Sequence, residues 1–144
     1  ESLGSLHAIR LKGVPHILVS PAIGAARWMS SVSPIPGIPA LMRHIFKPYS
    51  PDRQSLEFTH KILWHYRGIR KQVLDQSPRR GGNDYFFAFF GTADHYRRSG
   101  VVSVRKWRKY FGEDSYNIYE GTHFMEDEYL HTMLIPKIIS VLGL

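Results

Sequence analysis

The sequence contains no cysteine among its 144 residues. This absence excludes disulfide bonds, thiolate nucleophiles and cysteine-based zinc sites. It does not fix the compartment, for which the cytoplasm is only the default, although the Asn-x-Ser/Thr signal for N-glycosylation is also missing. No apolar run approaches the roughly 20 residues that a membrane-spanning helix needs. The start of the chain shows no signal-peptide pattern, but its first residue is not methionine, so a targeting segment upstream of residue 1 stays open.

The sequence also has fewer acidic than basic side chains, with 12 Asp and Glu against 19 Lys and Arg, and its net charge is +7. The basic residues are spread out, and the densest groups are Arg97-Arg98 and residues 105–109. At helical spacing such groups are typical of a solvated face. A basic nucleic-acid-binding domain is the alternative, but no known binding motif is present. We therefore expect no nucleic-acid partner, while contact with a lipid surface stays open and no oligomeric state is predicted.

Hydrophobic content of 43% and 13% aromatics indicate globular material. The apolar pattern predicts helices that alternate with short strands. We expect strands over residues 16–20, 85–90 and 115–120. We expect helices over residues 3–11, 41–46 and 101–111, from Ser50 or Asp52 to Asp75, and over 126–142 with a kink at Pro136. The stretch 21–39 is rich in Pro, Gly and Ser and is predicted to be a loop, and residues 77–83 are predicted to be a polar break.

Strands separated by helices indicate an α/β fold with a parallel sheet and right-handed crossovers. Three strands are too few for a closed doubly wound domain, so we expect further strands upstream of residue 1. In such a sheet, ligands bind beyond the carboxyl ends of the strands. Asp94 follows the second predicted strand in Gly91-Thr92-Ala93-Asp94, and His123 follows the third in Gly121-Thr122-His123. Ser2 directly precedes the first predicted helix.

These residues carry a resemblance to a known family. Glu1-Ser2-Leu3-Gly4 resembles the last four residues of the nucleophile elbow Gly-x-Ser-x-Gly of the α/β-hydrolase superfamily, which includes esterases, lipases and thioesterases. The chain order Ser, Asp, His is also that of the family. The elbow's first glycine is not in the sequence, and Ser5 stands where a second glycine is frequent. The resemblance implies the C-terminal half of the fold, beginning inside the elbow.

The resemblance implies a serine hydrolase that cleaves a carboxylic ester or thioester of a small or lipid-like acyl substrate. Ser2 would be the nucleophile, His123 the base, Asp94 its acidic partner and the Leu3 amide an oxyanion donor. Residues 1–22 would form the elbow helix and following strand, 23–83 a helical cap or lid, and 84–144 the C-terminal core. The missing N-terminal part of the fold would be a partner, in the same or a separate chain. We expect no activity from the isolated 144 residues, and no cofactor or metal.

Several alternatives stay open. Glu120 or Asp114 could replace Asp94, whereas His95 shares the turn of Asp94 and is a poor partner for it. A substrate pocket is assigned to Trp28, Met29, Phe46 and Phe124, although apolar cap residues also serve ordinary packing. His60 and His65 are five residues apart, which is not the spacing of a helical ligand pair. The chain could also be a non-catalytic relative that acts as a scaffold or binding module.

Overall fold

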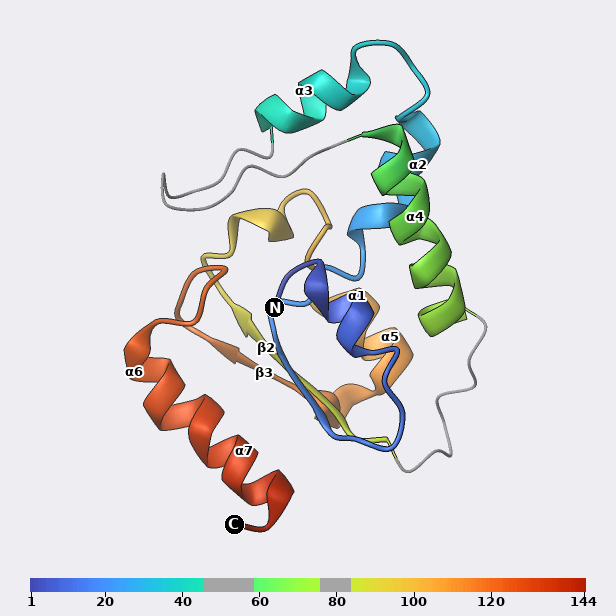
Figure 1. The fold of residues 1–144 in the computed structure, drawn as a ribbon. Coiled ribbons are helices and arrows are strands. Elements are labelled where there is room, and N and C mark those ends of the chain that lie inside the picture. Colours follow the sequence, from blue (N-terminus) through green and yellow to red (C-terminus); the bar gives the residue numbers. More distant parts are fainter. Residues whose placement is uncertain (46–58, 76–83) are drawn as a thin grey trace.

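The computed structural model describes residues 1–45, 59–75 and 84–144, which form a mixed α/β structure (Figure 1). Its sheet has three parallel strands in the order β1-β2-β3. They are β1 (His16–Val19), β2 (Phe86–Gly91) and β3 (Tyr116–Tyr119). His16 pairs with Phe86 at the start of β1, and Gly91 pairs with Tyr119 at the end of β2. The three predicted strands and their parallel arrangement are thus confirmed.

Helices flank this sheet. In chain order they are α1 (Gly4–Ala8), α2 (Ala25–Val32), α3 (Ile38–Ile45), α4 (His60–Arg70) with the π-helical turn η1 (Lys71–Asp75), the 3-10 turn η2 (His95–Arg97), α5 (Val104–Phe111), the 3-10 turn η3 (Glu113–Ser115), α6 (Asp127–Tyr129), the π-helical turn η4 (Leu130–Leu134) and α7 (Ile135–Leu142). No helix in the described ranges is long and apolar enough to cross a membrane.

The central strand β2 explains why helices cover both faces of the sheet. Its residues Phe87 to Gly91 are all buried, and side chains alternate between the faces of a strand. Ala88 and Phe90 belong to the larger core cluster, which contains residues of α1, α2, α4 and α5. Phe87 and Phe89 belong to a second cluster that packs against residues of α6 and η4. A strand that is apolar on both faces requires cover on both, which the helices provide.

Helix α5 shows how local sequence signals position one of these covering elements. Ser103 caps its start, because the side chain accepts a hydrogen bond from the Lys106 amide at 3.3 Å. Gly112 ends it with a φ of 100°, a conformation that glycine adopts without strain. Trp107 is completely buried, and its ring lies 6.2 Å from that of Phe90 on β2. This anchor fixes α5 on the sheet and contributes about 1.5–3 kcal/mol through burial.

The prediction that residues 21–39 form a loop is wrong, because α2 occupies residues 25–32. The prolines and glycines that suggested a loop lie outside these eight residues. Within them, Ala25, Met29 and Ser30 are buried, so tertiary packing stabilises the helix. Gly24 precedes it at a close backbone approach, since a Cβ there would overlap the Gly100 carbonyl oxygen. The loop-like composition thus belongs to the ends of a helix.

The remaining helix predictions differ from the structure mainly at their boundaries. Thr59 is the N-cap of α4, and its side chain accepts a hydrogen bond from the Ile62 amide at 3.2 Å. The predicted caps Ser50 and Asp52 lie outside the described residues. Near the end of the chain, the π-helical turn η4 stands directly before α7, whose first turn contains Pro136. A proline removes one amide from the helical ladder, and the wide turn lies where that ladder is interrupted.

Candidate functional site

Asp94 lies in the turn that follows β2, and the backbone of this turn is joined to the segment after β3. The Thr92 amide donates to the Tyr119 carbonyl and the Ala93 amide to the Gly121 carbonyl, both at 2.9 Å. Asp94 then caps η2, because its Oδ1 accepts from the Tyr96 amide at 2.8 Å. These bonds hold the backbone and one carboxylate oxygen of Asp94 in place. The second oxygen, Oδ2, points away from the cap.

The segment after β3 positions His123 in a similar way. The Thr122 amide donates to Glu126 Oε1 at 2.9 Å, and the Tyr119 hydroxyl donates to the Thr122 carbonyl at 3.1 Å. Burial raises the pKa of Tyr119, and the negative charges of Glu126 and Asp94 raise it further, so the phenol stays protonated and can donate. The hydrogen-bonded loop carries His123 to a position where only 1% of its surface is exposed.

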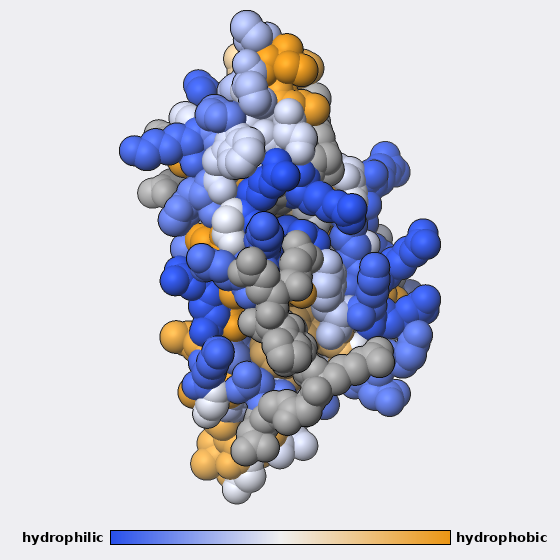
Figure 2. Space-filling view, turned by 90° about the vertical axis from the view of Figure 1, so that its right-hand side faces the viewer, coloured by the Kyte–Doolittle hydropathy of each residue, from blue (hydrophilic) through white to orange (hydrophobic). Residues whose placement is uncertain are grey.

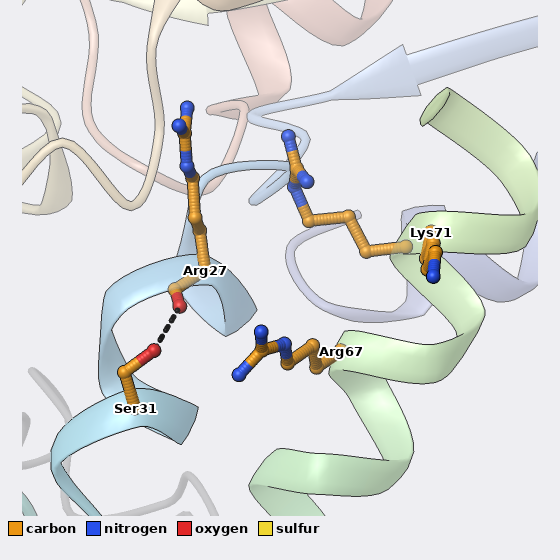
Figure 3. A pocket seen from close by; sticks show the side chains of 5 residues that line it. Arg27, Ser31, Arg67 and Lys71 are labelled. Atoms are coloured by element: carbon orange, nitrogen blue, oxygen red, sulfur yellow. Dashed lines mark hydrogen bonds between the residues drawn. The ribbon is translucent and has the colours of Figure 1, made fainter. Parts of the chain in front are cut away.

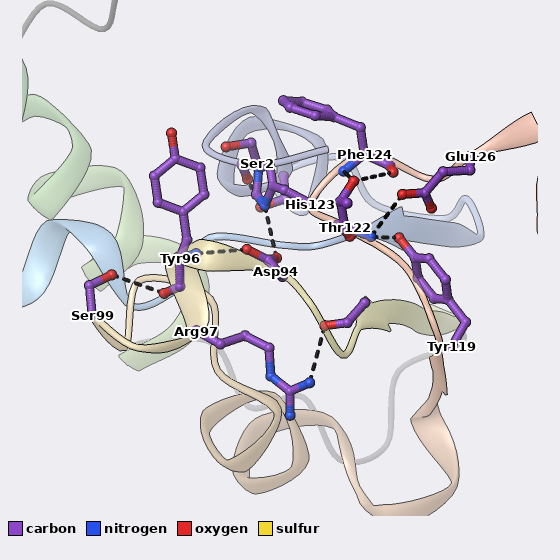
Figure 4. A network of polar contacts seen from close by, with 12 residues as sticks. Ser2, Asp94, Tyr96, Arg97, Ser99, Tyr119, Thr122, His123, Phe124 and Glu126 are labelled. Atoms are coloured by element: carbon purple, nitrogen blue, oxygen red, sulfur yellow. Dashed lines mark hydrogen bonds and ion pairs between the residues drawn. The ribbon is translucent and has the colours of Figure 1, made fainter. Parts of the chain in front are cut away.

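Asp94 and His123 meet in the buried space between the two turns, as Figure 4 shows. His123 Nδ1 lies 2.9 Å from Asp94 Oδ2, and the two side chains are 1% and 0% exposed. Burial raises the pKa of Asp94, but the hydrogen bond and charge of His123 and the Tyr96 amide outweigh it, so the pKa lies below its usual value. The carboxylate is therefore ionised at neutral pH and accepts a hydrogen bond from Nδ1–H, which leaves Nε2 as the ring nitrogen that can accept a proton.

Two glycines permit this approach of the turns. A Cβ on Gly91 would overlap the carbonyl oxygens of Thr122 and Gly121, and a Cβ on Gly121 would overlap the Tyr119 ring and Glu126. Only a residue without a side chain lets the two backbones come so close. Glycines at these positions are therefore part of what brings Asp94 to His123.

Aromatic rings surround the His123 imidazole. The ring of Tyr96 lies 4.7 Å away and that of Phe124 4.9 Å away, both edge to face, and the His95 ring lies at 5.9 Å. Burial lowers the pKa of His95, only partly offset by the charge of Asp94. Burial also raises the pKa of Tyr96, as does the charge of Asp94. Both groups are therefore neutral near pH 7, so the charge next to the His123 ring is that of the Asp94 carboxylate.

Ser2 lies at the same edge of the sheet. It forms an isolated parallel bridge with Pro21, two residues beyond the end of β1, and its carbonyl accepts from the Ala22 amide at 3.1 Å. Its φ is 52°, a left-handed conformation that a serine adopts at a cost of about 1–3 kcal/mol. Such strain is typical of a nucleophile held on a sharp turn before a helix, and α1 begins two residues later.

The serine and the histidine are not hydrogen-bonded in this structure. His123 Nε2 is buried and has no hydrogen-bond partner among the described residues. A buried nitrogen without a partner costs about 1–3 kcal/mol. Figure 4 shows Ser2 in the same cluster of residues as Asp94 and His123. The hydrogen bond between a nucleophilic hydroxyl and a histidine is often long when no substrate is bound. The unpartnered Nε2 of His123 is an acceptor that such a hydroxyl would satisfy.

The structure also places the other predicted residues. Leu3 is the N-cap of α1, at the helix end where amide groups have no partner within the helix. Phe124 is half-buried against His123, whereas Met29 belongs to the large core cluster. Nothing is described of the Trp28 side chain, and Phe46 lies outside the described residues. The pocket assignment of these four residues stays a prediction.

Of the three acids considered, Asp94 is the one bonded to His123. Glu120 and Asp114 are exposed. His95 contacts His123 through its ring but is exposed itself. No group of three or more histidine and acidic side chains that could hold a metal ion occurs in the described part of the chain.

Sequence reasoning missed Ser20, which lies at the end of β1 beside the pair. It is completely buried, has a φ of 45°, and its hydroxyl has no hydrogen-bond partner of acceptable geometry among the described residues. The hydroxyl nevertheless lies close enough to Asp94 to lower its pKa. The sequence offered one signal for Ser20, which is its position directly after β1, at the same sheet edge as Asp94.

No protein-family model matches the chain, and no curated protein or solved structure matches it at a significant level. The candidate site therefore depends on the geometry of Ser2, Asp94 and His123.

Proposed function

We propose that this chain carries the catalytic residues of a serine hydrolase of the α/β-hydrolase type, which cleaves a carboxylic ester or thioester. The observation that carries the proposal is the buried pair of Asp94 and His123, whose Oδ2 and Nδ1 atoms lie 2.9 Å apart. The other ring nitrogen of His123, Nε2, lacks a hydrogen-bond partner among the described residues, and Ser2, with its strained backbone, lies at the same sheet edge. A buried histidine–acid pair or a strained serine also occurs by itself in proteins without this activity. A serine, an acid and a histidine in this chain order, gathered at one edge of a parallel sheet, form a set that favours acyl transfer.

The chemistry would follow from the geometry. The Ser2 hydroxyl attacks the carbonyl carbon of the substrate while His123 Nε2 takes the hydroxyl proton. Asp94 accepts the Nδ1 proton in its hydrogen bond and stabilises the imidazolium. The carbonyl electrons move to the oxygen, which the Leu3 amide stabilises. No residue of this chain is assigned as a second oxyanion donor.

The tetrahedral intermediate then expels the alcohol or thiol, which leaves with the proton from His123. A water molecule then attacks the acyl-enzyme and gives a proton to His123. The second tetrahedral intermediate collapses and releases the acid, and His123 returns the proton to the Ser2 oxygen, which restores the hydroxyl. In this proposal residues 1–22 hold the nucleophile, 23–83 form a cap over a small or lipid-like acyl group, and 84–144 supply the acid and the base. The reaction needs no cofactor and no metal.

The test is labelling of Ser2 by a fluorophosphonate in the natural full-length protein. We expect a covalent adduct on Ser2, and Ser2→Ala or His123→Ala should lower kcat for an activated ester by about 10⁴- to 10⁶-fold. Ser140→Ala is the matched control, because Ser140 is exposed on α7. Retention of more than about a tenth of the activity in either site variant would exclude the assigned roles.

One observation favours a second candidate, a non-catalytic relative that serves as a scaffold or binding module. Nε2 of His123 is buried, and Ser2 does not bond to it. The same experiment separates the two functions. A folded full-length protein whose Ser2 stays unlabelled and which hydrolyses no ester would support the scaffold.

A further inference from the structure

A second feature of the chain lies away from Ser2, Asp94 and His123. Arg27, Ser31, Arg67, Arg70 and Lys71 line a pocket of about 340 Å³ (Figure 3). Four of these five residues are cationic, and none of the described side chains in the lining carries a negative charge. The volume falls in the range of small-molecule sites and exceeds what a single inorganic anion needs.

The cations come from two helices that pack against each other. Arg27 and Ser31 are four residues apart on α2, so they lie on one face of it. Arg67, Arg70 and Lys71 have the spacing i, i+3, i+4 at the end of α4 and the start of η1, so they also share a face. These two faces meet at the pocket, and Figure 3 shows side chains from both helices directed into it.

Two of the guanidinium groups are held in place. Arg70 is only 7% exposed, and it donates to the Ile23 carbonyl and to the Tyr110 hydroxyl, both at 3.0 Å. The Arg67 guanidinium lies 4.8 Å from the centre of the Trp64 ring. Fixed guanidinium groups lose less conformational freedom when they bind a ligand, and their planar donors match the oxygens of phosphate.

A fifth cation, Lys106, experiences the same positive potential. Its ammonium donates to the Gly100 carbonyl at 3.0 Å. Burial lowers the pKa of Lys106, and the positive charges of Arg70 and Arg27 lower it further. Like charges that converge repel one another, and this repulsion is relieved when an anion binds among them. Figure 2 shows that hydrophilic side chains dominate the face of the molecule on the side of α4.

We propose that the pocket between α2 and α4 binds the phosphate or diphosphate group of a soluble organic molecule. A concave site with arginines on two walls recognises a group with oxygens in several directions, which phosphate provides and a carboxylate does not. The space beyond one phosphate accommodates the organic part of the ligand. The hydroxyl of Ser31, which now lies 3.4 Å from the Arg27 carbonyl, is a further donor for a phosphate oxygen.

The test is calorimetric titration of the full-length protein with inorganic pyrophosphate at about 0.15 M ionic strength, where diffuse surface attraction is screened. We expect saturable binding to one site. Arg27→Gln and Arg67→Gln should each weaken it by about tenfold or more, because each removes a charge-assisted contact. Arg27 and Arg67 are exposed, so both variants should fold.

The control is Arg10→Gln, which removes the same charge from an exposed position after α1 and should leave the affinity unchanged. An equal loss in Arg10→Gln, or no saturable binding at this ionic strength, would overturn the proposal. A parallel arm uses vesicles that contain phosphatidic acid. Binding to these vesicles that pyrophosphate does not displace would also overturn it, in favour of a lipid surface.

Discussion

The replacement Asp94→Asn is the sharpest test of the candidate site, because it keeps the shape of the side chain and removes its charge. Both carboxylate oxygens are in use. Oδ1 accepts from the Tyr96 amide at 2.8 Å, and Oδ2 faces His123 Nδ1 at 2.9 Å. An asparagine has one acceptor oxygen and one donor nitrogen, so it cannot accept both bonds.

The Tyr96 bond decides how the asparagine lies. If its oxygen keeps the bond from Tyr96, its amide nitrogen faces His123 and donates to Nδ1. The imidazole proton then moves to Nε2, the nitrogen that accepts the proton of Ser2 in the proposed mechanism. In the opposite orientation, two N–H groups face each other at the Tyr96 amide, which costs about 1–3 kcal/mol in a buried place. The structure therefore predicts the wrong tautomer of His123.

We expect kcat for ester hydrolysis to fall by about 10⁴-fold, the loss that a triad with the wrong histidine tautomer suffers. The free energy of unfolding at pH 7 should fall by about 1–1.5 kcal/mol, the difference between a charge-assisted hydrogen bond and a neutral one. The pKa of Asp94 is lowered in the folded state. Its contribution is therefore complete above the unfolded value of about 3.9 and is lost as pH falls through the folded value.

The measurements are steady-state hydrolysis of an activated ester, urea unfolding between pH 7 and pH 2, and nitrogen NMR of the His123 ring. The stability difference between the wild type and Asp94→Asn should shrink below about pH 4. An Asp94→Asn protein with wild-type kcat would refute the proposed role of Asp94. A stability difference that stays constant down to pH 2 would refute the inference that an ionised Asp94 accepts the bond from His123.

Three further predictions concern packing, and urea denaturation measures each. Gly91→Ala should destabilise the fold by about 1–3 kcal/mol, because its Cβ would overlap backbone oxygens beside His123. Gly68→Ala in α4, where a Cβ meets nothing, should instead stabilise the fold by about 1 kcal/mol. Equal effects of the two substitutions on the free energy of unfolding would contradict this reasoning. Trp107→Phe should cost about 1–3 kcal/mol, since the indole donates at 3.0 Å to the Ser115 carbonyl and hydroxyl; a neutral result would mean these bonds add nothing. Leu6→Ala should cost about 2–5 kcal/mol because Leu6 is completely buried, and a loss below 1 kcal/mol would show that the surrounding core collapses around it.

Local sequence signals predicted most of the secondary structure because their causes are local. The run Phe86–Phe90 lacks polar residues and is bounded by a glycine, which is typical of a strand buried on both faces. Helix α2 could not be predicted in the same way. Its eight residues lie between flanks that contain Pro and Gly, and burial of Ala25, Met29 and Ser30 stabilises it. That burial depends on elements distant in the sequence.

The candidate site was predictable in part. Position after a strand singled out Asp94 and His123, because parallel strands bring their carboxyl ends to one edge. The elbow-like pattern before the first predicted helix singled out Ser2. The only sequence signal for the buried Ser20 beside Asp94 was its place after a strand, and the aromatic rings around His123 were not predictable. Neighbours of this kind follow from how turns pack in three dimensions, which residue spacing does not encode.

By itself the sequence determined where the strands lie to within one residue at each end, that they run parallel, and which polar residues follow them, since these depend on residue type and local pattern. Only the tertiary structure decided that Asp94, not Glu120 or Asp114, meets His123 at 2.9 Å. It alone also gathered Arg27 and Arg67, forty residues apart in the chain, around one pocket. Both outcomes depend on backbone approaches and helix packing between distant segments, which no local pattern specifies.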